Sequence, residues 1–236
     1  MKRALAAAIG ILTLAALPAF GADIPPRMPV KAPAYVAPVW NWTGFYIGVN
    51  GGYSWAQSEH TALGGTTGLF NQSGGLIGGT LGYNWQTGPA VFGIEADLDW
   101  ARINGSAALC PFGNCFTDMR SFGTVRGRLG YAAGMWMPYI TGGLAVADIR
   151  AGQDAFGGAT TDQWRTGWTV GGGIEAMFAP GWSAKVEYLY ADFGSSTTGY
   201  TPVGSGVPFT ASERNVNIIR GGINYHFGES PVVARY

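Results

Sequence analysis

The stretch over residues 44–55 alternates between two kinds of side chain, and this alternation restricts the fold more than any other feature. Its sequence is Gly-Phe-Tyr-Ile-Gly-Val-Asn-Gly-Gly-Tyr-Ser-Trp. One parity carries the large apolar side chains Phe45, Ile47, Val49, Tyr53 and Trp55, and the other carries small or polar ones. Side chains alternate across a β-strand, so the pattern predicts a strand with one apolar face. A helix would scatter the same aromatics around its circumference.

Seven further stretches repeat the pattern. We expect strands over residues 75–86, 90–101, 119–131, 138–147, 164–178, 182–191 and 215–227. Long connections, among them residues 102–118, 148–162 and 192–213, alternate with short turns such as residues 87–89 and 179–181. This rhythm is typical of an up-and-down meander with loops on one rim. The sequence therefore predicts an all-β, eight-stranded antiparallel up-and-down β-barrel, with strands near the length that a tilted strand needs to cross a bilayer.

The charged residues of the expected strands fall on the face opposite the apolar one. They are Glu95, Asp97, Asp99, Arg120, Arg126, Arg128, Arg165, Glu175, Lys185, Glu187 and Arg220. The ends of the apolar face are rich in Trp and Tyr, as the two interfacial girdles of a membrane barrel require.

Two arrangements satisfy this alternation. A lipocalin-like soluble barrel would turn its apolar face inward, and an outer-membrane barrel would turn it outward. Only 12% of the residues are charged, which is far below the usual share for a surface bathed in water. We therefore favour a transmembrane barrel whose narrow lumen is filled by side chains.

The lumen charges are placed for pairing across strands. Glu95, Asp97 and Asp99 lie on the strand next to Arg126 and Arg128. Lys185 and Glu187 lie between the strands that carry Glu175 and Arg220. Burying such charges without partners would be costly, so we expect a network of ion pairs. A structural plug is the favoured interpretation, and a selective ion path is the alternative.

The first residues have the features of a signal peptide. Lys2 and Arg3 precede an apolar run over residues 4–17, and small residues follow it. We expect residues 1–21 to be removed on export, leaving a Pro-rich periplasmic linker over residues 22–40. The barrel would occupy residues 41–227, with a C-terminal extension over residues 228–236.

Few residues suggest reaction chemistry. Cys110 and Cys115 lie close together in an expected loop, where an oxidising compartment favours a disulfide. His60 is expected in a loop and His226 in the lumen near a rim, and neither has ligands or a nucleophile at a suggestive spacing. We therefore expect no metal site, no cofactor and no enzymatic activity. Acids and bases balance at 14 each, so no basic footprint indicates nucleic acid.

Several motifs together resemble a known group of proteins. They occupy residues 41–48, 124–131 (TVRGRLGY), 138–145 (PYITGGLA), 182–194 (WSAKVEYLYADFG) and 231–236 (PVVARY). In this order they resemble the small outer-membrane β-barrel (porin-family) surface proteins of Gram-negative bacteria, with an OmpA/OmpX-like eight-stranded barrel. The resemblance covers nearly all of the expected mature chain. It implies a place in the cell outer membrane, among outer-membrane lipid and lipopolysaccharide.

The resemblance also implies two recognition features. Arg220, Gly222, Tyr225 and Phe227 match the pattern by which the barrel-assembly machinery recognises a final strand. The chain continues past Phe227, so either Phe227 or Tyr236 would act as the terminal aromatic. Some members are surface antigens and some bind haemin, for which His60 and Tyr200 would be the candidate iron ligands here.

Three functions follow as hypotheses. The first is a structural surface protein that supports envelope integrity and presents four extracellular loops. The second is a narrow porin-like channel for small solutes. The third is haemin or host-surface binding through the loops. The oligomeric state stays open.

Overall fold

The computed structural model describes residues 40–62, 65–110, 113–153, 159–194, 197–200 and 209–227. These residues form the nine strands β1 Gly44–Ala62, β2 Gly65–Thr87, β3 Ala90–Cys110, β4 Gly113–Tyr131, β5 Trp136–Gln153, β6 Ala159–Ala179, β7 Trp182–Asp192, β8 Thr197–Tyr200 and β9 Phe209–His226. No helix among the described residues is long and apolar enough to span a bilayer.

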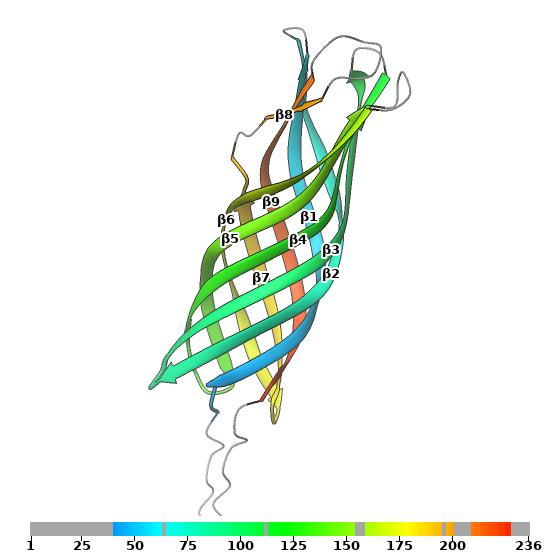
Figure 1. The fold of residues 1–236 in the computed structure, drawn as a ribbon. Coiled ribbons are helices and arrows are strands. Elements are labelled where there is room, and N and C mark those ends of the chain that lie inside the picture. The colour runs from blue at the N-terminus through cyan, green and yellow to red at the C-terminus, as the bar shows by residue number, and fades with distance from the viewer. Residues whose placement is uncertain are drawn as a thin grey trace, which may run out of the picture. The chain divides into compact units, whose positions relative to one another are not determined.

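Eight of these strands close into an antiparallel barrel. Each of β1 to β7 pairs with its neighbour in sequence, β7 pairs with β9, and β9 pairs back to β1 (Figure 1). The short strand β8 pairs with the first residues of β9. The predicted fold class is therefore confirmed, with β8 as an addition that the sequence pattern did not indicate.

The strands are longer than expected on one side of the barrel. The predicted loop over residues 102–118 is mostly a hairpin, because β3 runs to Cys110 and β4 starts at Gly113. The predicted connections over residues 148–162 and 192–213 likewise contain the ends of β5, β6, β8 and β9. These hairpin arms extend at the top of Figure 1. Beyond the hydrocarbon layer the outer face of a strand meets water, so large apolar side chains are no longer required on that face although the backbone ladder continues.

The other rim carries the short turns. Gly88, Gly134 and Gly181 adopt positive φ angles of 60°, 65° and 75° there, which glycine adopts without steric cost. Two of these turns are the ones predicted over residues 87–89 and 179–181. Successive strands can therefore reverse within two to four residues on this rim.

The apolar parity faces outward. Phe45, Ile47 and Val49 are 61%, 51% and 66% exposed, while Tyr46 and Asn50 on the opposite parity are buried. Ten residues separate Phe45 from Trp55, which is about 33 Å along a strand and about 25 Å along the axis of a barrel tilted by roughly 40°. That height matches the apolar band of a transmembrane barrel. The prediction of an apolar exterior is confirmed, and the lipocalin-like alternative is wrong.

One charged side chain was assigned to the wrong face. The sequence pattern placed Arg120 in the lumen, but it is exposed. The register of β4 shifts between Met119 and Ser121 relative to β5, so an extra residue interrupts the alternation. A one-residue irregularity of this kind moves a side chain to the opposite face of a sheet.

Candidate functional site

Charged side chains from five strands meet in the middle of the lumen. Their side chains are almost completely buried. They come from β3 (Glu95, Asp97, Asp99), β4 (Arg126, Arg128), β6 (Glu175), β7 (Lys185, Glu187) and β9 (Arg220). The inward parity of each strand explains this placement, because every second residue must point into the barrel.

Arg126 crosses the lumen and joins three strands. Its guanidinium donates to Glu187 Oε1 at 2.8 Å and to Asp97 Oδ2 at 2.9 Å, and it also contacts Glu95. Its Nε donates to the hydroxyl of Thr124 at 2.8 Å. Strands β4 and β7 are not neighbours, so the contact with Glu187 ties opposite parts of the wall together.

Arg220 makes a second bridge across the lumen from β9. It donates to Asp97 Oδ1 and to Asp99 Oδ2, both at 2.9 Å, and to Glu187 Oε1 at 3.2 Å. Asp97 and Glu187 are shared with Arg126, whereas the ion pair of Asp99 is with Arg220.

The remaining cations lie closer to the rim of short turns. Arg128 pairs with Glu175, and its guanidinium carbon lies 3.7 Å from the ring centroid of Tyr139. Lys185 Nζ donates to Glu95 Oε2 at 2.8 Å. Cation–π contact and carboxylate pairing together hold the Arg128 guanidinium over the aromatic ring.

The charges nearly balance within this lumen charge network. Five carboxylates (Glu95, Asp97, Asp99, Glu175, Glu187) face four cations (Arg126, Arg128, Lys185, Arg220). Ion pairs that are excluded from water are costly to break on one side only, because the partner is left charged and desolvated. Such an arrangement favours one fixed packing of side chains across the lumen.

Neutral hydrogen-bond partners, to which the sequence pattern assigned no role, complete the network. Tyr46 donates to Glu95 Oε2 at 2.8 Å, and Thr124 donates to Asp97 Oδ2 at 2.6 Å. Asn224 donates to Glu175 Oε1 at 2.8 Å. Their position on the inward parity was the available signal, because a polar group that is buried in the lumen needs a hydrogen-bond partner.

A serine, a histidine and a glutamate meet at the end of the network, although their spacing in the sequence gave no hint of it. Ser183 donates to Glu175 Oε1 at 2.5 Å, and its oxygen lies 2.9 Å from His226 Nε2. Glu175 approaches the same ring nitrogen at 3.3 Å, and Nδ1 has no partner in the described residues. In a hydrolytic triad the acid orients the histidine through Nδ1 so that Nε2 can take the serine proton. Here the hydroxyl proton of Ser183 is donated to the carboxylate of Glu175 and not to His226 Nε2.

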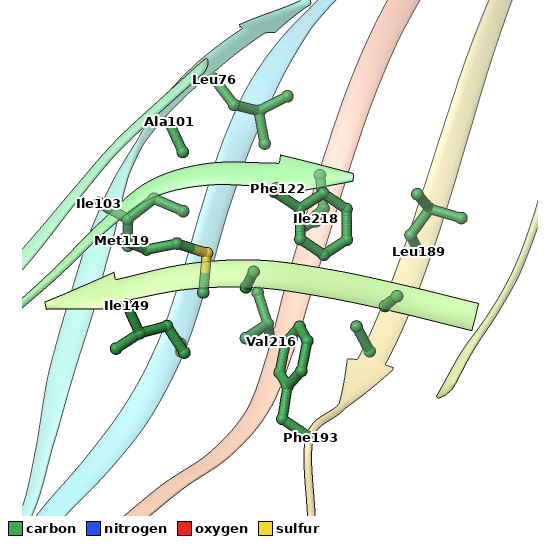
Figure 2. Close-up of a cluster of buried hydrophobic side chains, with 14 residues drawn as sticks. Leu76, Ala101, Ile103, Met119, Phe122, Ile149, Leu189, Phe193, Val216 and Ile218 are labelled. Carbon is green, nitrogen blue, oxygen red and sulfur yellow. The ribbon is translucent and has the colours of Figure 1, made fainter. Parts of the chain in front are cut away.

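An apolar layer fills the lumen beyond the charges, toward the long hairpins. Figure 2 shows it as side chains from several strands pointing toward one another. The large members are Leu76, Ile103, Met119, Phe122, Ile149, Leu189, Phe193, Val216 and Ile218. The rings of Phe122 and Phe193 meet edge to face at 6.5 Å.

The alternating pattern of the strands did not predict this apolar layer. Its signal was the loss of alternation, as in the run Tyr188-Leu189-Tyr190 and the pair Ile218-Ile219, where both faces of a strand are apolar. When the inward-facing residue between two outward-facing apolar residues is also apolar, the lumen at that height is expected to be apolar as well.

A third layer closes the lumen at the rim of short turns. Trp42, Val91, Met137 and Met177 are buried together there. The backbone N–H of Trp42 donates to Gln86 Oε1 at 2.8 Å, which fixes the chain just before β1. The lumen thus has an apolar layer, a charged layer and a second apolar layer in succession.

The residues of the expected assembly signal divide between the two faces of β9. Arg220 points into the lumen, whereas Tyr225 and Phe227 lie on the exterior with ring centroids 5.0 Å apart. Gly222 pairs with Asn50 on β1 and Lys185 on β7.

The loop residues singled out from the sequence lie mostly on strands. The backbone of His60 pairs with Ala211, so His60 belongs to β1 rather than to a loop. Tyr200 ends β8. Cys110 ends β3 and Cys115 lies in β4, and neither pairs directly with the other in the ladder. The side chains of these four residues lie outside the described part, and so do the expected signal peptide, most of the linker and the C-terminal extension. The disulfide and these domain boundaries stay predictions.

Comparison with known proteins identifies relatives along nearly the whole chain. The 31 kDa outer-membrane immunogenic protein of Brucella melitensis biotype 1 is 34% identical over 92% of this chain and 97% of its own. The 25 kDa outer-membrane immunogenic protein of Brucella abortus biovar 1 is 32% identical over 92% and 96%. Among solved structures, the outer membrane protein OprG from Pseudomonas aeruginosa matches with a TM-score of 0.48 and 14% identity over 79% of this chain and 98% of its own.

The family assignment rests on the sequence match and agrees with the geometry. The model of the outer membrane protein beta-barrel domain matches residues 6–227. The closed barrel with an apolar exterior is the architecture that such a domain needs in a bilayer. The chain is an outer-membrane β-barrel protein that belongs to the outer membrane protein beta-barrel domain family.

Proposed function

We propose that this protein is a structural surface protein whose barrel supports the outer membrane and does not conduct solutes. The observation that carries the proposal is the filling of the lumen by three consecutive layers of buried side chains. Arg126 reaches Glu187 on β7 and Arg220 reaches Asp97 on β3, and in each case the two strands are not neighbours. A diffusing ion would have to displace these pairs and then cross a dry apolar layer, which has no groups to replace its hydration shell.

Surface display is the second part of the proposal. Four connections (β1 to β2, β3 to β4, β5 to β6 and β7 to β9) lie on the rim opposite the short turns. Two Brucella relatives are described as immunogenic, which fits exposure of such hairpins outside the cell. Long antiparallel arms would hold the connections away from the membrane.

Planar-bilayer recording of the refolded mature protein tests the closed lumen. Closure of the barrel is first verified by a different gel mobility before and after boiling. We expect no stable openings from the wild-type protein. The double variant Arg126→Ala/Glu187→Ala, which removes a bridge across the lumen, tests whether the network forms the barrier. Stable wild-type openings would replace the structural role with that of a channel.

The role in the envelope has its own test. We expect a deletion strain to become more sensitive to detergents, and we expect both the wild-type gene and a variant with shortened hairpins to restore resistance. Unchanged resistance of the deletion strain would refute a supporting role.

We also propose that β9 carries the signal for the barrel-assembly machinery, with Phe227 as the terminal aromatic. Phe227 is exposed on the wall beside Tyr225, immediately after the last paired residue of β9. Phe227→Ala should lower the amount of folded barrel in the outer membrane, whereas Tyr236→Ala should not. The reverse result would assign the signal to the end of the chain.

A further inference from the structure

A polar pocket opens on the exterior of the barrel beside the exposed aromatics Tyr53 and Trp55, on the side of the long hairpins. It has a volume of about 490 Å³ and lies across β9, β1 and β2. Its exterior lining includes two aromatics and uncharged polar side chains, among them Tyr53, Trp55, Gln57, Asn71, Ser73 and Asn217. Such a group of amides on the wall of a membrane barrel is unexpected, because the wall just below is apolar.

The strand register explains the shape of this pocket. Trp55 lies in one row between Ser73 on β2 and Asn217 on β9. In the next row Tyr53 lies beside Gly75, which has no side chain and leaves the surface open. Tyr188 donates to Asn217 Oδ1 at 2.6 Å, which leaves the amide N–H groups free to donate outward. Exposed aromatic faces beside amides match a sugar ring, which has apolar C–H faces and an edge of hydroxyls.

An apolar groove lies directly below the pocket, on the same three strands and on β3. Its volume is about 480 Å³, and its exterior lining includes Val49, Gly51, Ile77, Trp100, Gly221 and Ile223. Gly51 pairs with Gly221, so two neighbouring strands lack side chains at the same height. Gly51 is four residues from Trp55, or about 13 Å along the strand. A groove of this kind within the hydrocarbon layer has the chemistry and position for an acyl chain.

Two arginines lie on the exterior beside the pocket. Arg102 pairs with Gly75, and Arg120 occupies the irregularity of β4 opposite Arg102. Both are exposed. In the part of the chain that the structure describes, neither forms an ion pair. Two guanidiniums on neighbouring strands can bind a phosphate group through several hydrogen bonds.

We propose that this face of the barrel binds one phosphorylated glycolipid of the outer leaflet, of lipopolysaccharide chemistry. A sugar of the headgroup occupies the pocket around Trp55, its phosphate contacts Arg102 and Arg120, and an acyl chain lies in the groove at Gly51 and Gly221. The vertical order of polar pocket above apolar groove matches a lipid with its headgroup outward. The proposal rests on the location in the outer membrane and is independent of whether the lumen conducts.

Titration of the full mature barrel in detergent, followed by native mass spectrometry, tests the proposal. The probes are bis-phosphorylated lipid A, the same lipid without phosphates, its deacylated sugar phosphate and phosphatidylglycerol. We expect one lipid A per barrel, bound about tenfold more tightly than phosphatidylglycerol. The deacylated sugar phosphate should bind more weakly than the intact lipid, because it cannot fill the groove.

Three variants test the three parts of the site. Arg102→Gln/Arg120→Gln should remove the preference for phosphorylated lipid, and Trp55→Leu should weaken both glycolipids. Gly51→Leu/Gly221→Leu should weaken the intact lipids but not the deacylated sugar, and both positions have room for a Cβ atom. Trp164→Leu and Gly127→Leu/Gly142→Leu are the matched controls, since these residues also lie on the exterior, on β4, β5 and β6.

Specific outcomes would overturn the proposal. One is equal affinity of the wild-type barrel for lipid A and phosphatidylglycerol. Another is an equal loss of binding in the control variants. A third is that leucines in the groove change the oligomeric state but leave lipid binding unchanged. That result would assign the groove to contact between copies of the chain.

Discussion

Replacing Arg220 by Met tests the structural role of the lumen charge network most directly. Met keeps much of the length of the side chain but removes the guanidinium. Arg220 donates four hydrogen bonds to Asp97, Asp99 and Glu187. After the change Asp97 and Glu187 still contact Arg126, whereas Asp99 loses its cation. The network then contains five carboxylates and three cations.

The expected cost follows from these contacts. Hydrogen bonds between charged groups contribute about 1.5–3 kcal/mol each, so four of them set an upper limit of roughly 6–12 kcal/mol. Arg126 still compensates two of the three carboxylates, which lowers the cost toward the range of about 3–5 kcal/mol typical of a broken buried pair. We therefore expect Arg220→Met to reduce the free energy of unfolding by about 4 kcal/mol. Adding Asp99→Asn should restore about half of the loss, because it removes the carboxylate left alone.

Urea unfolding of the barrel in lipid vesicles, followed by tryptophan fluorescence and gel mobility, measures these differences. Asp162→Asn is the control, because Asp162 is exposed and lies outside the lumen charge network and the proposed lipid site, so the change should alter stability by no more than about 0.5 kcal/mol. A loss below about 1 kcal/mol for Arg220→Met would refute the role of the network as a plug that holds the barrel together. So would a double variant that is less stable than the single one, because it would show no coupling between Arg220 and Asp99.

Three further changes test other parts of the structure. Gly143→Ala should impair folding, because a Cβ atom there would lie 2.7 Å from the Cα atom of Arg126 on the neighbouring strand β4. Gly142→Ala has room for the Cβ atom and should be nearly neutral, and the yield of refolded barrel compares the two variants. Phe122→Ala should cost about 3–5 kcal/mol by opening a cavity in the apolar layer, and a change within about 0.5 kcal/mol in urea unfolding would contradict that packing. Cys110 and Cys115 should appear as one disulfide-linked peptide in a non-reduced digest of protein from the outer membrane, and two free thiols there would reject the pairing.

Much of the barrel could be predicted from local pattern. The alternation from Phe45 to Trp55 indicated a strand, the residues that share its apolar face and a length sufficient to cross the membrane. Its repetition indicated the number of barrel strands. The ends of the strands could not be predicted in this way, because the hairpin arms above the membrane have no apolar outer face and yet keep their backbone hydrogen bonds. Arg120 was misplaced for a related reason, since a bulge depends on how two strands fit together.

The charged residues of the site could be identified, but their partners could not be assigned. Parity placed Glu95, Asp97 and Arg126 in one lumen. The contact of Arg126 with Glu187 depends on the curvature of the closed barrel, which brings β4 and β7 face to face. Ser183, His226 and Glu175 meet for a different reason, because they lie on the neighbouring strands β7, β9 and β6 and the register of these strands brings them together. No spacing along the chain encodes such contacts.

The sequence by itself determined which side chains share a face, because a period of two is a property of the strand alone, and its low share of charged residues determined which face meets lipid. Only the tertiary structure decided how the lumen is closed, where charges and apolar side chains form separate layers, and where the wall has a pocket above a groove. These features arise from closure of the sheet, which fixes the register of each strand against both neighbours and brings distant residues to the same height.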